Sequence, residues 1–357
     1  MSGSDRKSGA ALAHAVAAPQ RDGRRRGPHP LSGLLALLTD ACGDDRARLA
    51  AALRGVRVYQ DHPYRRALPD MPVVARAGGS TIRDYGGVGP TVLFVPSPIN
   101  PPTVLDLMEG NSLLRWLSEQ GLRVLLLDWG EADDDWRAAG LDTLVERLAT
   151  LIAATAPAAV AGYCLGGTLA LAAPVAVPHL ALLATPWHFD GYSAAQRSAI
   201  ARHAAATREL SAGFGAYPVE LLQPGFWALD REAVVNKFVR LAGLDPADPR
   251  AAAFVALEDW TNEGTPLPLR AARDLFDDLF AQDRSGRGEW QLGGRMVAPP
   301  DVPILNVTAR RDRLVPPATA LRAGTRLDLD AGHVGMIVGG RAREQLWEPL
   351  AKFLRGD

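Results

Sequence analysis

The sequence predicts an α/β protein built on a mostly parallel, doubly wound sheet. Short apolar runs that end in Gly, Pro, Asp or Ser alternate with segments of helical periodicity. Such alternation is typical of parallel strands joined by helices that cover both faces of the sheet. The strands we expect are residues 92–95, 124–127, 158–161, 180–183, 304–307 and 327–329. Because ligands of such sheets bind at the carboxyl ends of the strands, we expect the site on the loops found there.

Composition excludes several classes of protein. The chain has 357 residues, 47% hydrophobic and 22% charged, which is ordinary for a globular protein. Basic and acidic residues number 39 and 40, so no overall field favours nucleic acid. The only cysteines, Cys42 and Cys164, exclude a disulfide framework and favour the cytoplasm. No run is long enough to be a transmembrane segment, and no metal-binding spacing occurs, so we expect neither metal nor cofactor.

Two segments precede the expected core. Residues 1–30 are rich in Ala, Gly, Pro and Arg and are predicted to be a disordered tail. Its arginine cluster is either simply solvated or a weak electrostatic tether to an acidic partner or surface. Residues 31–85 form an N-terminal helical and extended segment, whose two short amphipathic helices between 31 and 53 are expected to pack on the main domain.

The core is predicted to be interrupted by a cap. Residues 86–185 and 301–357 carry the alternating strands and helices. Between them, residues 186–300 show helical and loop patterns, which predicts a helical cap insertion over the active site. The segment contains many large aromatic residues, most of which we expect to form the core of the cap itself.

A glycine-rich box surrounds Cys164. The box is Gly162-Tyr163-Cys164-Leu165-Gly166-Gly167, placed between a predicted strand and a helical pattern. This is the strand-to-helix elbow of the α/β-hydrolase fold, with cysteine in place of serine. Glycines let strand and helix pass closely, and the positive end of the helix favours a thiolate. The alternative is a small buried hydrophobic cysteine, which is the role we expect of Cys42.

Asp312 and His333 complete a candidate catalytic triad. Asp312 lies on the loop after the strand at 304–307, and His333 on the loop after the last strand. The order nucleophile, acid, histidine is the order of the α/β-hydrolase fold. As alternatives, Asp312 could pair with a neighbouring arginine on the surface, and His333 could be an ordinary loop histidine. Asp328 and Asp330 are the nearest competing carboxylates, but they follow too late in the chain.

An acyl-transfer site also needs donors for the oxyanion. One expected donor is the backbone N–H of Leu165, directly after the nucleophile. The other should come from the loop after 92–95, where four prolines lack an N–H. Ser97, Ile99 and Asn100 remain, and we favour Ile99, with Asn100 beside it as a substrate-binding residue. The alternative is that this loop is only a rigid proline turn.

From about Tyr59 onwards the chain resembles the polyhydroxyalkanoate synthases, α/β-hydrolase-superfamily enzymes that polymerise 3-hydroxyacyl-CoA. The cysteine box is the most specific part of the resemblance, because ordinary esterases of this fold carry serine. The other segments that carry it are Val95-Pro96-Ser97-Pro98-Ile99-Asn100, Leu105-Asp106-Leu107, Leu127-Asp128-Trp129-Gly130, Glu258-Asp259-Trp260-Thr261-Asn262-Glu263-Gly264, Asp312 with Val315-Pro316-Pro317, and Gly332-His333-Val334-Gly335.

The resemblance implies an acyltransferase mechanism. Cys164 would accept the acyl group with release of CoA, His333 would activate the thiol and the substrate hydroxyl, and Asp312 would assist. The implied partners are 3-hydroxyacyl-CoA and a polyester chain or granule surface, in the cytoplasm. The chain has the size of the short, class III-like catalytic subunits, which implies a second synthase subunit, and we expect a homodimer.

Two other functions are compatible with the same residues. An acyl-CoA thioesterase or an intracellular polyhydroxyalkanoate depolymerase would use the same triad and differ only in the final acceptor, water instead of an alcohol. A catalytically silent granule protein or partner subunit is a third interpretation. The presence of Cys164, Asp312 and His333 together argues against it.

Overall fold

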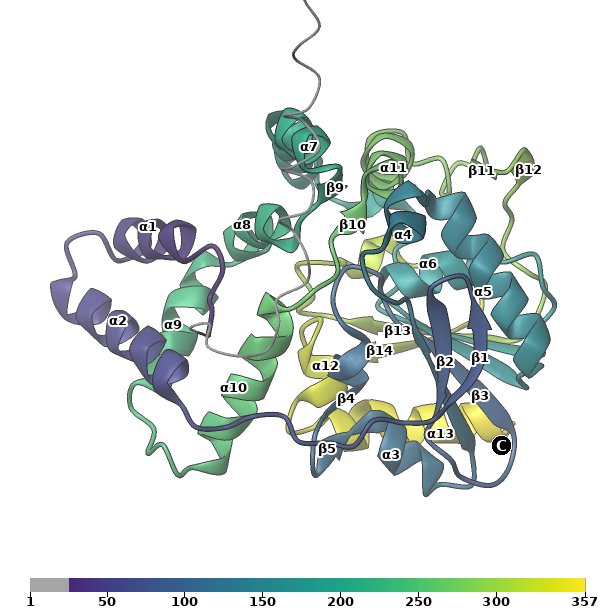
Figure 1. Cartoon of the computed structure of the whole chain (residues 1–357), viewed down its shortest axis with the longest axis horizontal. Coiled ribbons are helices and arrows are strands. Elements are labelled where there is room, and N and C mark those ends of the chain that lie inside the picture. Colours follow the sequence, from purple (N-terminus) through teal and green to yellow (C-terminus); the bar gives the residue numbers. More distant parts are fainter. Residues whose placement is uncertain (1–25, 357) are drawn as a thin grey trace, which may run out of the picture.

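The computed structural model describes residues 26–356, and Figure 1 shows a twisted sheet flanked by helices beside a separate helical lobe. Residues 1–25 of the predicted tail therefore lie outside the described residues. The structure does describe residues 26–30 of that predicted tail, and Arg26 forms an ion pair with Asp259. Within residues 26–356, none of the helices combines the length and the apolar composition needed to cross a membrane.

The main sheet has eight strands in the order β1-β2-β6-β3-β7-β8-β13-β14. β2 runs antiparallel to both β1 and β6, and the remaining neighbouring pairs are parallel. This strand order, with helices on both faces, is the α/β-hydrolase fold that the sequence predicts. The strands are β1 (Val73–Ala77), β2 (Ser80–Asp84), β3 (Thr91–Val95), β6 (Arg123–Asp128), β7 (Ala159–Tyr163), β8 (His179–Leu183), β13 (Ile304–Ala309) and β14 (Thr325–Leu329).

All six predicted strands are present, but the hairpin β1-β2 was not predicted from the sequence. Its first strand is largely exposed and carries no continuous apolar run, so it lacks the pattern of a buried strand. The sheet consequently begins at Val73, ahead of the predicted core boundary at residue 86. The central strands β7 and β13 are buried along their whole length, as expected of parallel strands covered on both faces.

Two apolar cores lie on opposite faces of the sheet. One packs α5 and α6 against the sheet, and the other packs α3, α12 and α13. The helices of this part are α3 (Leu113–Ser118), α4 (Asp134–Ala138), α5 (Leu141–Thr155), α6 (Leu165–Ala172), α12 (Gly335–Val338) and α13 (Glu348–Arg355), with shorter turns η2 (Pro102–Leu105), η5 (Pro317–Thr319) and η6 (Arg343–Trp347). A small hairpin is formed by β4 (Asp106–Met108) and β5 (Asn111–Ser112).

The segment between β8 and β13 is mainly helical. Its elements are η3 (Phe189–Gly191), α7 (Ala194–Phe214), β9 (Ala216–Tyr217), α8 (Val219–Leu229), α9 (Arg231–Leu241), α10 (Pro249–Asn262), β10 (Leu267–Pro268), α11 (Leu269–Arg273), η4 (Asp274–Ala281), β11 (Gln291–Leu292) and β12 (Arg295–Met296). Most of its large aromatic side chains are buried, although Phe214 is exposed. They serve mainly as core, as the sequence predicts.

The N-terminal helices α1 (Leu31–Cys42) and α2 (Arg46–Asp61) pack on the inserted segment and form a lobe with α8, α9 and α10 (Figure 1). The prediction that they pack on the main domain was wrong. Their apolar stripe, including Leu38 and Tyr59, joins Phe238 and Val255 in a third apolar core. Sequence periodicity shows that a helix has an apolar face, but it does not show which surface covers that face.

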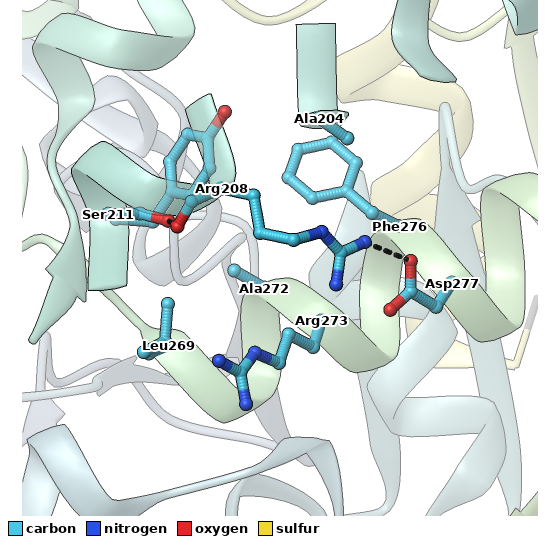
Figure 2. Close-up of a pocket in the computed structure, with 9 residues that line it drawn as sticks. Ala204, Arg208, Ser211, Leu269, Ala272, Arg273, Phe276 and Asp277 are labelled. Atoms are coloured by element: carbon cyan, nitrogen blue, oxygen red, sulfur yellow. Dashed lines mark hydrogen bonds and ion pairs between the residues drawn. The ribbon is translucent and has the colours of Figure 1, made fainter. Parts of the chain in front are cut away.

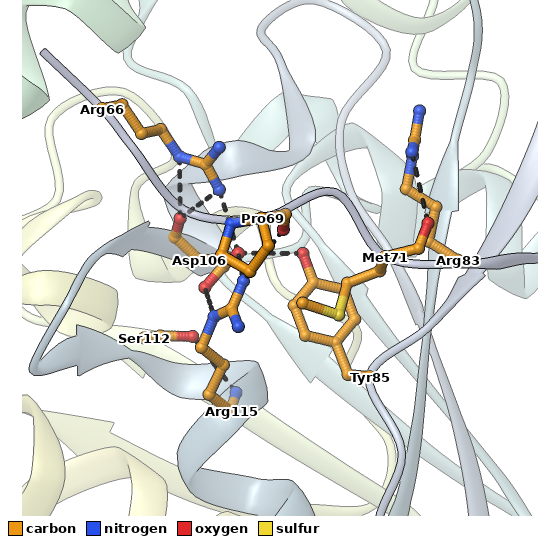
Figure 3. A network of polar contacts seen from close by, with 8 residues as sticks. All are labelled: Arg66, Pro69, Met71, Arg83, Tyr85, Asp106, Ser112 and Arg115. Carbon is orange, nitrogen blue, oxygen red and sulfur yellow. Dashed lines mark hydrogen bonds and ion pairs between the residues drawn. The ribbon is translucent and has the colours of Figure 1, made fainter.

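A buried carboxylate fixes the irregular segment, residues 62–72, that connects this lobe to the sheet. Asp106, which is 1% exposed, accepts hydrogen bonds from Arg66, Arg115 and the Tyr85 hydroxyl (Figure 3). The two guanidinium contacts measure 2.9 and 2.7 Å. A buried charge is tolerated when it is paired and hydrogen-bonded in this way. Arg66 thereby ties the connecting segment to the start of β4.

We predict that Gly55→Ala destabilises the lobe, because an added Cβ would lie 1.9 Å from the backbone oxygen of Phe238. The helices α2 and α9 must then separate, which should lower the free energy of unfolding by about 1–3 kcal/mol. Urea unfolding measures this effect. The matched control is Gly213→Ala in α7, where an added Cβ meets nothing within 4 Å and should stabilise by about 0.5–1 kcal/mol. Equal effects of the two substitutions would contradict the tight contact.

Candidate active site

Cys164 lies at a strained turn between β7 and α6. Its backbone has φ 54° and ψ −130°, a combination that residues with a side chain rarely adopt. The turn is held by two hydrogen bonds: the Cys164 N–H donates to the Leu183 carbonyl at 2.9 Å, and the Gly167 N–H donates to the Cys164 carbonyl at 3.0 Å. This geometry presents the side chain at the start of a helix, as in the elbow of the α/β hydrolases.

The three glycines of the box are required by close packing, against backbone at Gly162 and Gly166 and against a side chain at Gly167. A Cβ at Gly162 would lie 2.3 Å from the Cα of Gly167, and one at Gly166 would lie 2.2 Å from the carbonyl oxygen of Val95. At Gly167 it would lie 1.9 Å from the Thr185 hydroxyl. The close passage that the sequence predicts is confirmed. It also brings α6 directly against the loop that follows β3.

The structure brings Asp312 and His333 together. Asp312 Oδ2 lies 2.6 Å from His333 Nδ1. Its other oxygen, Oδ1, accepts the backbone N–H groups of Leu314 and Val315 at 2.9 and 2.8 Å. The carboxylate is therefore fixed by its own loop and can orient the imidazole ring.

The alternatives for these residues are not supported by the contacts. Arg311 and Arg313 form ion pairs with Asp330 and Asp230, rather than with Asp312. The competing carboxylate Asp328 is engaged by Thr308 and Arg326. Asp312 is therefore the carboxylate that holds His333.

The electrostatics of the site keep His333 protonated. Burial alone would lower the pKa of His333, but the charges of Asp312 and Cys164, and hydrogen bonds to both, raise it to about 10. The side chains of Asp312 and His333 are 0% and 9% exposed, so little water weakens these interactions. Cys164 is partly exposed and is the accessible member of the group.

Two buried tyrosines lie close to the candidate triad, and neither was predicted from the sequence as a site residue. The ring of Tyr163 stacks on His333 with centroids 5.1 Å apart, and its hydroxyl donates to the His333 carbonyl at 3.3 Å. The hydroxyl of Tyr192, from the inserted segment, donates to the Leu314 carbonyl at 3.1 Å. Burial, together with the negative charges of Cys164 and Asp312, raises the pKa of both tyrosines, so they remain neutral. The only sequence signal was the position of Tyr163 beside the nucleophile.

The loop after β3 lies next to the elbow, as expected of an oxyanion loop. Val95 pairs with Gly162 across the parallel strands β3 and β7. The Leu165 N–H is at the first position of α6 and has no acceptor within the helix. The Ile99 N–H donates to the Ser97 hydroxyl at 3.2 Å, and the Asn100 side chain donates to the Glu263 carbonyl at 3.4 Å. Ile99 thus already uses its N–H within the loop, and its assignment as the second donor stays a prediction.

Two tryptophans hold this loop at both ends. Trp129 Nε1 donates to the Pro96 carbonyl and Trp260 Nε1 to the Pro101 carbonyl, each at 2.8 Å. Both tryptophans belong to segments that carry the family resemblance. Their role as supports of the loop was not evident from the sequence, because it depends on contacts between residues far apart in the chain.

A small pocket between α7 and α11 is separate from these residues. Figure 2 shows Arg208 paired with Asp277 there, at 3.1 Å. The pocket has a volume of about 20 Å³, enough for a single water molecule, and none of its lining residues belongs to the candidate triad. It therefore adds nothing to the candidate active site.

Comparison with known proteins shows what the chain is similar to. No protein-family model matches it. The poly(3-hydroxyalkanoate) polymerase subunit PhaC of Haloferax mediterranei is 27% identical over 285 residues, covering 73% of this chain and 58% of that protein. The subunits of the same name from Haloarcula marismortui and Allochromatium vinosum are each 26% identical, covering 78% and 74% of this chain and 63% and 80% of their own lengths. The chain thus spans less than two thirds of the two haloarchaeal relatives.

Similar solved structures include the proline iminopeptidase-related protein TTHA1809 from Thermus thermophilus, with 18% identity, TM-score 0.47, and coverage of 80% of this chain and 98% of that one. An esterase from Exiguobacterium antarcticum has 16% identity, TM-score 0.45, and coverage of 80% and 99%. The fold assignment rests instead on the strand order and the elbow described above. The sequence resemblance to polyhydroxyalkanoate synthases is confirmed by the relatives.

We predict that His333 titrates far above its ordinary pKa of 6.5, near 10. Because the folded-state pKa is raised, the stabilisation from the protonated histidine is complete below pH 6.5 and is lost as the pH rises through about 10. Asp312→Asn removes one of the attracting charges and should lower the pKa by about 1–3 units. Nitrogen NMR of labelled imidazoles measures the pKa of His333 in the wild type and in Asp312→Asn. His188, whose pKa is lowered by burial, is the internal control and should titrate alike in both proteins. A wild-type midpoint below pH 7 for His333 would contradict the ion pair.

Proposed function

The chain is a sequence relative of poly(3-hydroxyalkanoate) polymerase subunits, and from this premise we propose that it is an acyltransferase that polymerises 3-hydroxyacyl-CoA through an acyl group carried on Cys164. One observation supports this most directly. A cysteine at the nucleophile elbow faces a histidine that is held by a buried carboxylate at 2.6 Å. Nucleophile, base and orienting acid are the parts that covalent acyl transfer needs.

In the first step, the Cys164 thiolate attacks the carbonyl carbon of the CoA thioester. The negative charge passes to the carbonyl oxygen, where the Leu165 N–H and a second donor from the loop at 97–100 would stabilise it. When the tetrahedral intermediate collapses, the bond to the CoA sulfur breaks and His333 gives its proton to the leaving thiolate. The products are acyl-Cys164 and free CoA, with His333 now neutral.

In the second step, a hydroxyl group attacks acyl-Cys164. Neutral His333 takes the hydroxyl proton, an ester bond forms, and the thiolate of Cys164 leaves. The charge of Asp312 stabilises the imidazolium that results. Repetition with the terminal hydroxyl of a growing chain yields a polyester and restores the protonated His333 and thiolate.

A thiol nucleophile suits this cycle better than an alcohol. Exchange of one thioester for another keeps the acyl group activated until a hydroxyl attacks it, whereas a serine ester would lose that activation. The activated substrate is the CoA thioester itself, and the proposed chemistry requires no metal and no other cofactor. We further propose a polyester chain or granule surface as partner, a cytoplasmic location at such granules, a homodimer, and a second synthase subunit as in the short two-subunit synthases.

We predict that the purified protein releases CoA from 3-hydroxybutyryl-CoA and forms a polyester. Cys164→Ala should lower CoA release by about 1000-fold or more, because the attacking atom is removed. Free CoA is measured with a thiol reagent, and the acyl product by chromatography and mass spectrometry. A matched control is Cys42→Ala, which alters a buried cysteine in the N-terminal lobe and should leave turnover nearly unchanged.

The acyl product distinguishes the candidate functions. Polymer with loss of activity in Cys164→Ala supports the synthase, whereas free 3-hydroxybutyrate would identify an acyl-CoA thioesterase. Absence of CoA release should be followed by addition of candidate second subunits and by assay of polyester hydrolysis. Activity that persists in Cys164→Ala would contradict the assignment of the nucleophile.

A further inference from the structure

The last turn of α10 and the residues after it hold the loop that follows β3. This loop, residues 96–102, serves as the oxyanion loop in the proposed function. Trp260 Nε1 donates to the Pro101 carbonyl at 2.8 Å, and the Glu263 carbonyl accepts from the Asn100 side chain at 3.4 Å. Gly264 lies so close to the loop that an added Cβ would be 2.8 Å from the Ile99 carbonyl oxygen. Three contacts from one short segment therefore fix the position of residues 99–101.

Other residues of the same turn are held by the N-terminal segment. Asp259 Oδ1 lies 2.9 Å from Arg26 Nε and accepts the Tyr59 hydroxyl at 2.9 Å. The His29 N–H donates to the Asn262 side chain at 2.7 Å. Asp259 directly precedes Trp260, and neighbouring residues of a helix point in different directions. The turn is therefore in contact with the N-terminal segment on one side and with the loop after β3 on the other.

The side chain of Arg26 is largely buried and donates to several partners. It is 7% exposed. Besides Asp259, it donates to the carbonyl oxygens of His62, at 2.7 Å, and Tyr64. A surface ion pair would contribute little, but a buried guanidinium shared between a carboxylate and backbone carbonyls defines one geometry. Arg26 therefore joins three parts of the chain: the start of the described segment, the end of α2 and the end of α10.

We propose that Arg26 is a positioning residue for acyl transfer: its contact with Asp259 fixes the last turn of α10 and, through Trp260, the oxyanion loop beside Cys164. Arg26 itself touches none of the reacting residues in the described structure. The proposal rests on the Cys164 nucleophile and the oxyanion loop of the proposed function, but it does not depend on whether the acyl group ends in a polymer or in water.

The physical consequence of losing Arg26 is specific. Asp259 would lose its ion pair and keep the Tyr59 hydroxyl as its hydrogen-bond partner, and a partly buried carboxylate with too few partners draws water or moves outward. Either change displaces the turn that carries Trp260. Donors to an oxyanion must be placed within a fraction of an ångström, and a misplacement of about 1 Å can lower a rate by about 100-fold. The thiolate and His333 are held by other loops and should be unaffected.

The test compares two reactions of Cys164 in the full-length protein. Acylation by p-nitrophenyl acetate, followed as the burst of p-nitrophenolate, develops an oxyanion. Alkylation by iodoacetamide consumes the same thiolate without forming one. For Arg26→Ala we expect acylation to fall by about 10-fold or more, with alkylation within about two-fold of wild type. Arg26→Lys keeps the positive charge but not the planar guanidinium group with its several N–H donors. Its acylation rate should therefore lie between those of wild type and Arg26→Ala.

The matched control is Arg48→Ala. Arg48 also ties the N-terminal helices to the inserted segment, through Glu232 at 2.5 Å and Asn236 at 3.0 Å, but it does not contact the last turn of α10. Both of its rates should equal those of wild type. If the acylation rate of Arg26→Ala is unchanged, the proposal is overturned. It is also overturned if the acylation and alkylation rates fall in parallel, because Arg26 would then only maintain the fold. Because neither probe requires polymerisation, failure of the synthase assignment would leave this result interpretable.

Discussion

The close passage of α6 across the ends of β3 and β7 is the constraint on which the candidate site depends. Gly162 and Gly166 leave no room for a side chain, and Cys164 accepts an unfavourable backbone conformation because the turn is fixed on both sides. The same passage brings the loop after β3 next to Cys164, since a Cβ at Gly166 would lie 2.2 Å from the Val95 carbonyl oxygen. Cys164 and this loop are therefore positioned by the same close contact.

Paired carboxylates, two buried and one partly buried, then hold the segments around this contact. Asp312 orients His333, Asp106 fixes the segment that leads into β4, and Asp259 holds the end of α10. Each carboxylate has at least two partners, which is the condition under which a buried charge is tolerated. Such pairs add little to net stability, but they favour one geometry, because any displacement leaves a charge without its partners. A site that must place donors accurately gains from that property.

The parts predicted from the sequence are those fixed by local pattern. The six strands, the elbow glycines and the order of Cys164, Asp312 and His333 follow from runs of neighbouring residues and from where each loop begins. The parts that were missed depend on tertiary contact. The exposed strand β1 lacks an apolar run, and the amphipathic faces of α1 and α2 do not reveal that α9 covers them. The stacking of Tyr163 on His333 joins residues that lie far apart in the chain.

The inserted segment has a second role that its aromatic content does not reveal. Tyr192 lies near Cys164 and Asp312, and Trp260 donates to the Pro101 carbonyl in the loop after β3, so the segment contributes residues to the candidate site. Its helices α9 and α10 also share a core with α1 and α2. A displacement of the N-terminal helices would therefore be transmitted to residues 99–101 through packed side chains and hydrogen bonds. The loop at residues 99–101 is thus connected by direct contacts to Arg26 and the N-terminal helices, although these lie far from it in the sequence.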